Sequence, residues 1–477
     1  MNNVSLKYLS YKFLFVIIVF LNTNYIYSKS FLNDGADEFK LILDNFQFNC
    51  LASLEQITTL PYSYSRIYNQ LLFKDFQSEF CNEESKKIIQ YIDKIFLEKP
   101  NIIGIQLGSS SYNLSSYGKK FNDKSNIFFE HNGHSNNISY SLRATFIDNK
   151  ERFDESYISY YTHSNKIITI GRVSKWWGPS EEVSLILSNQ ARPISGLTFE
   201  NNVSRKIKYL NFLGPTNYKF FVGTLRNDSY INKAKLLGAR YSFFPSKKFS
   251  FSLSRTAQWG GEGRPENLNS LINVIIGRDN FGDGGISIEN EPSNQLAAID
   301  FIIKPLNKSN FKIFSQIAGE DESGYLPSRT FYNIGISYNN NKLNPFNFSI
   351  EYTDTFSSSN IKNYTYSHNV YKDGYRYSGK PIGANIDADS DAFYIKYNKI
   401  LKNGDVLKLK LFDANINKNN NQKNFWHNSH FELRGYQLSL IKELSPNLFI
   451  DINYNYFQSS NNIKDSNDFF IKLIYKI

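Results

Sequence analysis

Alternation of hydrophobic and polar residues limits the fold of this 477-residue chain more than any other feature of its sequence. In each of the segments 346–353, 407–411 and 448–456, a hydrophobic residue occupies every second position. A period of two is typical of a β-strand, whose successive side chains point to opposite faces of the sheet. Segments of this kind follow one another from about residue 101 to the C-terminus, which predicts an all-β chain.

Strands with one hydrophobic and one polar face fit either a soluble sandwich or a closed membrane barrel. Aromatic residues make up 16% of the chain, which suits many half-buried strands. A sandwich rarely needs this many strands, and after the N-terminal segment no hydrophobic run reaches the ~18 residues of a membrane-spanning helix. We therefore predict an all-β transmembrane barrel of about eighteen antiparallel strands over residues 100–477.

The connections between these strands differ in length in a regular way. Short turns are predicted at 402–404 and 443–447, whereas long polar loops occupy 260–293, 357–388 and 416–430. Outer-membrane barrels have short turns at the periplasmic end and longer loops at the exterior end. The pattern thus predicts which end of the barrel faces outward.

One exterior rim position can be assigned from the segment FSFSLSRTAQWGGEGRP at 249–265. Its strand pattern stops at Trp259, where glycines and a proline follow, and tryptophan favours a membrane-water boundary. At the other end of the chain, FFIKLIYKI resembles the signal that the barrel-assembly machinery recognises, although it ends in Ile477 rather than phenylalanine.

The N-terminal residues 1–28 are predicted to be a signal peptide. Lys7 and Lys12 precede a short hydrophobic run that ends at Leu21, and Ser28 offers a small residue for cleavage. Removing the two lysines lowers the formal net charge from +10 to +8. We expect an exported protein in the outer membrane of a Gram-negative bacterium, in contact with outer-membrane lipid and lipopolysaccharide. The positive charge favours anionic partners.

Residues 29–99 have a different pattern, with hydrophobic residues at three- and four-residue steps. This spacing predicts a small α-helical bundle, placed at the periplasmic end as a plug. The chain's only two cysteines, Cys50 and Cys81, lie in this part. In an oxidising compartment they are expected to form a structural disulfide, the alternative being two separate buried thiols.

Several long segments carry a family resemblance. GRVSKWWGPSEEVSLILSNQARPISGL, SLSRTAQWGGEGRPENLNSLINVIIGRDN, NQLAAIDF, GEDESGYLPSR and HNVYKDGYRYSGKPIG follow one another between about 171 and 391. The sequence resembles the Wzi family of capsule-assembly outer-membrane proteins. The resemblance implies an eighteen-stranded barrel closed by a periplasmic helical bundle. It also implies a lectin-like protein, without enzymatic activity or cofactor, that binds capsular polysaccharide and helps attach the capsule. Ala384 stands where the family often has histidine.

Nine residues are candidates for contact with an acidic polysaccharide. Guanidinium and ammonium groups suit its carboxylates, and aromatic rings suit its sugars; the alternatives are solvated surface charges and packing or membrane-interface aromatics. Strand parity places the tryptophan pair at the periplasmic side or folded into the lumen, and the other candidates at the rim or in exterior loops. The candidates are Arg255, Arg264, Arg278, Arg376, Lys380, Trp176, Trp177, Tyr375 and Tyr377.

Two other functions fit parts of the pattern. A porin or sugar-specific channel would share the barrel and its basic lumen. An outer-membrane hydrolase would need a Ser, His and acid constellation, for which Ser367, His368 and Asp373 are the local candidates. No nucleic-acid partner is indicated, and a monomer is expected.

A metal site is not expected. The acidic run that ends at Asp391 starts like a calcium loop, but Ala392 replaces the required glycine and Asn398 the closing glutamate. The histidine pairs, in Asn-rich loops, lack a third ligand nearby.

Overall fold

The computed structural model describes most of the chain after residue 100. Described are residues 31–32, 59–63, 85–86, 89 and 101–477, the last without 110–113, 117–123, 136, 149, 226–228, 280–284, 288, 306–309, 324–325, 341–345, 358–361 and 402–403. The predicted signal peptide, nearly all of the predicted helical bundle, and both Cys50 and Cys81 lie outside the described residues.

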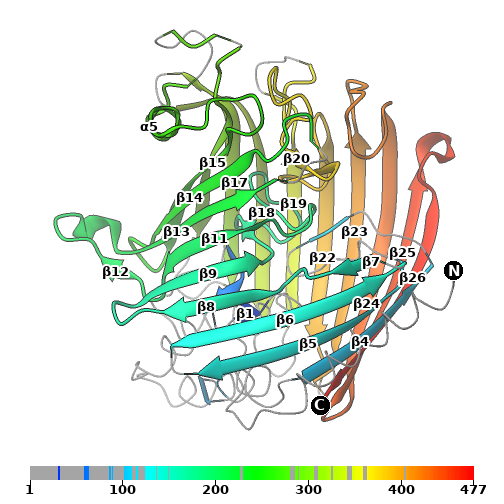
Figure 1. Cartoon of the computed structure of the whole chain (residues 1–477). Helices are drawn as coiled ribbons and strands as arrows, with labels where there is room; N and C mark the ends of the chain where they lie inside the picture. The colour runs from blue at the N-terminus through cyan, green and yellow to red at the C-terminus, as the bar shows by residue number, and fades with distance from the viewer. Residues whose placement is uncertain are drawn as a thin grey trace, which may run out of the picture.

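The described strands form one closed antiparallel barrel (Figure 1). Its members are β4 (Asn101–Gly108), β5 (Asn126–Ser135), β6 (Ile138–Ile147), β7 (Lys150–Arg152), β8 (Tyr157–Tyr161), β9 (Lys166–Arg172), β11 (Ser195–Asn201), β12 (Arg205–Lys206), β13 (Pro215–Thr224), β14 (Lys235–Phe243), β15 (Phe249–Trp259), β16 (Ser293–Ile303), β17 (Phe311–Ser323), β18 (Leu326–Asn340), β19 (Phe346–Asp354), β22 (Asp391–Ile400), β23 (Val406–Ile416), β24 (Phe431–Ser445), β25 (Leu448–Ser459) and β26 (Ser466–Lys476).

Among the described residues the barrel has eighteen strands, which confirms the predicted barrel, whereas the predicted helical plug stays a prediction. β7 and β8 share one edge of β6, and β11 and β12 share one edge of β13, so each pair counts as a single barrel strand. The barrel closes between its first and last strands, where Lys476 pairs with Ile102.

The alternation in the sequence reappears as an outward hydrophobic face and an inward polar face. On β23, the exposed side chains Leu407 and Leu411 have 39% and 42% of their surface accessible, whereas Lys408 and Lys410 are buried. This arrangement, with polar side chains buried and leucines exposed, is the reverse of the arrangement in a water-soluble protein. The outer wall is therefore suited to lipid, and the polar side chains fill the interior.

The connections divide between the two ends as the sequence predicts. Residues 260–292, 355–390 and 417–430 join strands at one end, whereas 244–248 and 401–405 make short turns at the other. We call these the exterior end and the periplasmic end.

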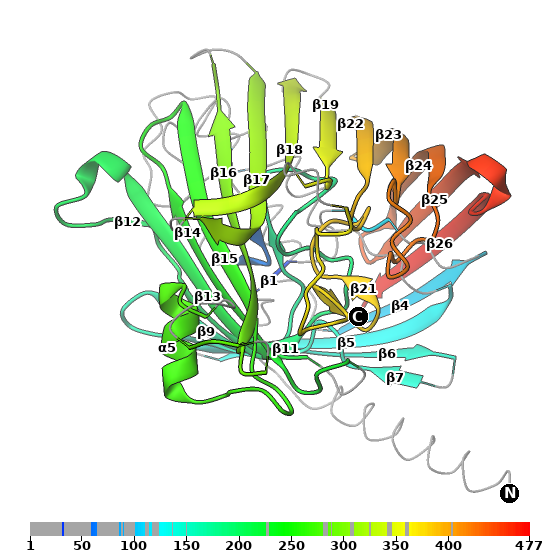
Figure 2. The same cartoon turned by 90° about the horizontal axis from the view of Figure 1, so that it is seen from above.

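Some described elements lie outside the barrel sheet. Helix α5 (Leu268–Ile276) follows β15, and two 3₁₀ turns, η1 (Asn211–Leu213) and η2 (Ser460–Asn462), lie in connections. No helix within the described residues is long and apolar enough to cross a membrane. The remaining short strands form two-residue pairs: β1 (Phe31–Leu32) with β3 (Tyr62–Ser63), β2 (Thr59–Leu60) with β10 (Trp176–Trp177), and β20 (Arg376–Tyr377) with β21 (Lys380–Pro381). In Figure 2, β21 lies inside the ring of strands and α5 outside it.

Candidate functional site

Residues 173–194, here called the first insert, leave the exterior end after β9 and fold into the lumen. Strand parity left the periplasmic side as one option for this segment, and that option is wrong. The split of one barrel strand into β7 and β8 makes the strand count ambiguous from sequence. The alternative, folding into the lumen, is confirmed by the contacts of this insert with inward-facing side chains of the barrel wall, and β10 pairs with β2 from the N-terminal part of the chain.

The tryptophan pair is a packing element of this insert. Trp176 and Trp177 are each only 1% exposed, and Trp176 donates a hydrogen bond from Nε1 to the carbonyl of Ser180 at 3.0 Å. Trp177 packs beside Gly238 of the barrel wall, where a side chain would collide with the indole ring. Neither ring offers a surface to a sugar in this conformation.

Hydrogen bonds from three adjacent wall strands hold the first insert across the lumen. Gln316 on β17 accepts from the backbone N–H of Leu185 at 2.7 Å, and Asn333 on β18 donates to the carbonyl of Val183 at 3.0 Å. Ser180 donates to the carboxylate of Glu351 on β19. The first two bonds satisfy backbone groups that would otherwise be buried without partners, and the third joins two buried side chains.

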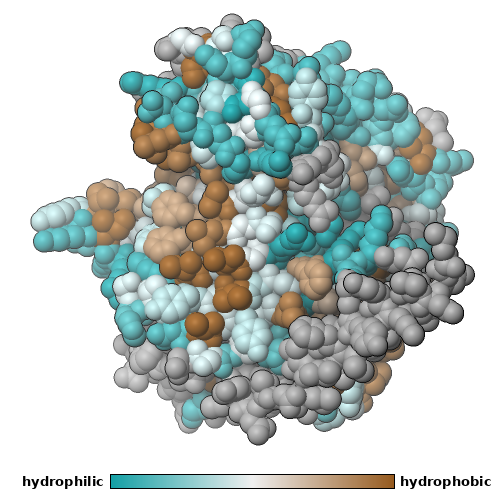
Figure 3. All heavy atoms as spheres, viewed as in Figure 1, coloured by the Kyte–Doolittle hydropathy of each residue, from teal (hydrophilic) through white to brown (hydrophobic). Residues whose placement is uncertain are grey.

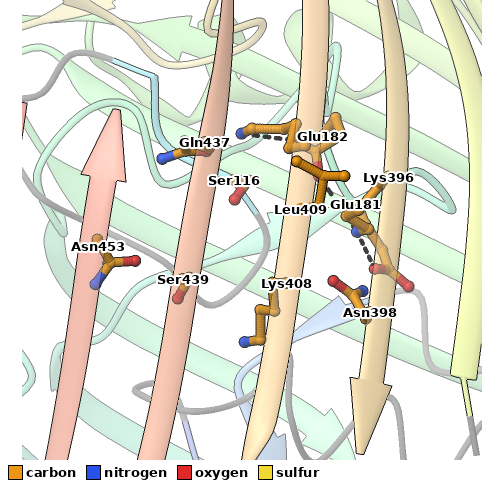
Figure 4. A pocket seen from close by; sticks show the side chains of 11 residues that line it. Ser116, Glu181, Glu182, Lys396, Asn398, Lys408, Leu409, Gln437, Ser439 and Asn453 are labelled. Atoms are coloured by element: carbon orange, nitrogen blue, oxygen red, sulfur yellow. Dashed lines mark hydrogen bonds and ion pairs between the residues drawn. The ribbon is translucent and has the colours of Figure 1, made fainter. Parts of the chain in front are cut away.

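Lys396 on β22 and Lys410 on β23 complete the attachment, and Figure 4 shows Lys396 beside Glu181. Glu182 lies 2.9 Å from Lys410 and 3.2 Å from Lys396, which also pairs with Glu181. A cavity of about 40 Å³ adjoins these ion pairs. It has room for a few water molecules but not for a sugar ring. The cluster therefore fixes the insert and is not itself a polysaccharide site.

Residues 355–390, here called the second insert, fold into the same lumen from the exterior end. Tyr366 donates from its hydroxyl to the carbonyl of Leu185 at 2.6 Å, and Tyr375 donates to that of Ile186 at 2.8 Å. Tyr375 is completely buried and Tyr377 is 4% exposed. These two candidates therefore pack between the inserts rather than facing outward.

Arg376 also has an internal role. Its guanidinium lies 2.7 Å from the carboxylate of Asp387 and donates to the carbonyls of Tyr366 and Asp373. A buried, fully engaged guanidinium stabilises the second insert and is not free for a ligand. Arg376 lies in a connection at the exterior end, as expected, but this connection turns inward and buries the side chain.

The remaining basic candidates lie in or against the connection that contains α5. Arg255 lies on the outer face of β15 and donates to the carbonyl of Ile275, while Arg264 donates to the carbonyl of Glu291 at 3.0 Å. Arg278 is exposed after α5.

Lys380 contacts a neighbouring exterior loop. Its Nζ atom lies 5.6 Å from the ring centroid of Phe425, which belongs to the neighbouring loop 417–430. Both side chains are half-buried.

Three exterior loops meet at a surface that the sequence analysis missed, here called the loop junction. Tyr230, which is 60% exposed, donates its backbone N–H to Asp373, and Lys372 lies 4.6 Å from the centroid of the tyrosine ring. Lys423 donates to the carbonyl of Lys372. An exposed aromatic ring beside two exposed ammonium groups can contact both a sugar face and a carboxylate.

The hydrolase candidates do not form a triad. His368 accepts backbone hydrogen bonds from Val370 and Tyr371 at Nδ1, and its Nε2 lies 3.6 Å from Glu291. Asp373 accepts from the Tyr230 backbone instead of orienting the histidine. Within the described residues, no group of three or more His, Cys, Asp or Glu side chains could hold a metal ion.

Asp389 gives a testable pH dependence. Burial raises the pKa of its carboxyl group from 3.8 to about 6. Because the folded state then binds the proton more tightly, the contribution of Asp389 to stability is greatest below pH 3.8 and falls as the pH rises to about 6. Asp389→Asn should remove this loss, raising the free energy of unfolding at pH 7 on the order of 2 kcal/mol. Denaturant titrations of parent and variant at several pH values measure the difference, and parallel profiles would contradict the assignment.

Comparison with known proteins places this architecture in a family. Residues 104–469 match the family described as capsule assembly protein Wzi. An uncharacterised 55.8 kDa protein in the cps region of Klebsiella pneumoniae is 31% identical over 308 residues. That alignment covers 63% of this chain and 60% of the relative, which is less than two thirds of the relative's length.

A solved structure shares the fold over nearly the whole chain. It is that of Wzi, an outer-membrane protein involved in group 1 capsule assembly in Escherichia coli and described as a carbohydrate-binding β-barrel. The TM-score is 0.83 at 22% identity, with 94% of this chain and 100% of that chain covered. Since the family match extends over more than half of the sequence, this chain belongs to the Wzi family of capsule assembly proteins.

Proposed function

We propose that this protein is an outer-membrane barrel that binds capsular polysaccharide at its exterior end and helps attach the capsule to the cell surface. The loop junction carries the proposal, because it combines an exposed tyrosine ring with the exposed ammonium groups of Lys372 and Lys423. The Escherichia coli Wzi structure, described as a carbohydrate-binding β-barrel, supports a carbohydrate as the ligand. The positive net charge of the chain, +10 including the predicted signal peptide, favours an acidic glycan.

The packing of the lumen favours a binding protein over a porin or sugar channel. The first and second inserts contact each other through Tyr366 and Tyr375, and the first insert is attached to five wall strands from β17 to β23. A permeating sugar would have to displace these buried hydrogen bonds and ion pairs. A polymer bound at the exterior loops would not.

Binding at the loop junction can be tested by substitution. Tyr230→Ala should weaken binding of purified protein to an acidic capsular polysaccharide about fivefold, since loss of an interface aromatic commonly costs about 1 kcal/mol or more. Adding Lys372→Gln and Lys423→Gln should weaken it further and reduce its sensitivity to salt. In cells, the triple variant should make capsule but release more of it into the medium.

The matched control is at the opposite end of the barrel. Lys206→Gln with Lys208→Gln removes two exposed lysines near the periplasmic end and should leave binding and capsule retention unchanged. Equal effects of the two sets would mean that net charge, not the loop junction, determines binding. Unchanged retention in a correctly inserted triple variant would contradict the proposed site.

A further inference from the structure

Helix α5 is a well-defined element on the outside of the barrel. Asn267 caps its N-terminus by accepting a hydrogen bond from the backbone of Ser270 at 2.9 Å, and Ser270 accepts in return from the backbone of Asn267. Gly277 ends the helix with φ of 70°, a left-handed conformation that favours glycine. Such caps specify where the helix begins and ends.

Two contacts hold α5 against the lipid-facing side of β15. Trp259 donates from Nε1 to the hydroxyl of Ser270 at 3.1 Å, and Arg255 donates to the carbonyl of Ile275 at 3.2 Å. Arg255 shares its outward strand face with Leu253, which is 44% exposed. The helix therefore lies beside the wall at the exterior rim, as Figures 1 and 2 show, and not above the lumen.

The surface that α5 turns away from the barrel is hydrophobic. Leu268, Ile272, Ile275 and Ile276 are 71%, 45%, 64% and 44% exposed. At 100° per residue these four side chains form one stripe, while Asn269 lies at its polar border. Figure 3 shows hydrophobic residues at α5 and on the barrel wall below it.

We propose that α5 is an interfacial helix that lies in the outer leaflet of the membrane, with its hydrophobic stripe among the acyl chains. The stripe continues the hydrophobic outer wall of β15, so the same lipid that covers Leu253 would cover it. Residues 268–277 carry no charged side chain, and the exposed Arg278 follows directly, where a guanidinium can reach lipid phosphates.

This placement would brace the exterior surface. The loop that contains α5 contacts the second insert at Tyr371, whose hydroxyl oxygen lies 2.7 Å from the carbonyl of Pro292 and 3.1 Å from that of Gly260. Tyr371 directly precedes Lys372 of the loop junction. A helix held by lipid would thus fix the height of that junction above the bilayer. The lipid contact itself does not depend on the proposed polysaccharide binding.

The inference can be tested with tryptophan as a depth probe. Ile275→Trp and Asn269→Trp are compared in full-length protein reconstituted into phosphatidylcholine vesicles, with and without bromine on the acyl chains, after subtraction of the parent's fluorescence. Tryptophan at 275 should emit at shorter wavelength and lose most of its fluorescence to the brominated lipid. Tryptophan at 269, at the polar border of the stripe, should be quenched less by the brominated lipid and more by iodide than tryptophan at 275.

Every outcome bears on the proposal. Quenching of position 275 by iodide alone would place the stripe in water and overturn it. Protection of position 275 from both quenchers would indicate a covering protein, such as a second copy, and would also overturn it. If Ile275→Trp does not fold, as judged by the change in gel mobility between unheated and boiled samples, Ile272→Trp repeats the measurement on the same stripe.

Discussion

Replacing Arg240 by glutamine should lower the free energy of unfolding by about 3 to 5 kcal/mol, because it leaves a buried carboxylate without its partner. Arg240 on β14 is 1% exposed and pairs with Asp300 on β16, across the intervening strand β15. Arg240 also donates to Ser254 at 2.6 Å, and Asp300 accepts from Gln316 at 2.7 Å. Denaturant unfolding of the protein refolded in lipid vesicles measures the change.

Two controls separate this pair from ordinary charge effects. Lys233→Gln removes an ion pair with Glu262 in which both side chains are more than half exposed, at 57% and 53%. Because both groups face solvent, its effect on the free energy of unfolding should be small compared with that of Arg240→Gln. Combining Arg240→Gln with Asp300→Asn should recover part of the lost stability, since no charge is left unpaired. An Arg240→Gln effect no larger than that of Lys233→Gln would contradict the assigned role.

Removing both inserts should convert a poorly conducting barrel into an open pore. Each insert leaves and re-enters the barrel between paired residues, Arg172 opposite Ser195 and Asp354 opposite Asp391. A two-residue Asn-Gly turn can therefore replace each insert without disturbing the strand register. Single-channel recordings in planar bilayers measure the conductance.

The predicted N-terminal bundle provides the comparison. Deleting residues 29–99 alone should leave conductance low, because the inserts still fill the lumen. Deleting the same residues together with both inserts should give a large, steady conductance. A large conductance after the N-terminal deletion alone would show that the bundle is the main barrier. A large conductance from the intact protein would favour the channel function.

The sequence predicted the barrel because strand alternation is local. A period of two requires only neighbouring residues, and it persists on β23, where leucines face outward and Lys408 and Lys410 inward. Loop lengths are also a local property of the sequence. They therefore predicted the exterior loops and the rim position of Trp259, which is the last residue of β15. The helical bundle and the disulfide of Cys50 and Cys81 remain predictions.

The candidate site could not be predicted in the same way. Tyr375, Tyr377 and Arg376 have the composition of exposed binding residues, yet their loop folds inward and buries them. The loop junction joins Tyr230, Lys372 and Lys423, which are far apart in the sequence and have no shared local pattern.

The sequence by itself determined the barrel, the side of each strand that faces lipid, and the division into short turns and long loops. Only the tertiary structure decided that two exterior loops fold into the lumen and that one of them, the second insert, meets two further exterior loops at the loop junction. The physical reason is that the alternation of hydrophobic and polar residues is set by the geometry of each strand, whose successive side chains face lipid and lumen in turn. The path of a loop instead depends on distant partners, such as Glu182 with Lys396 and Lys410, whose proximity exists only in the closed barrel.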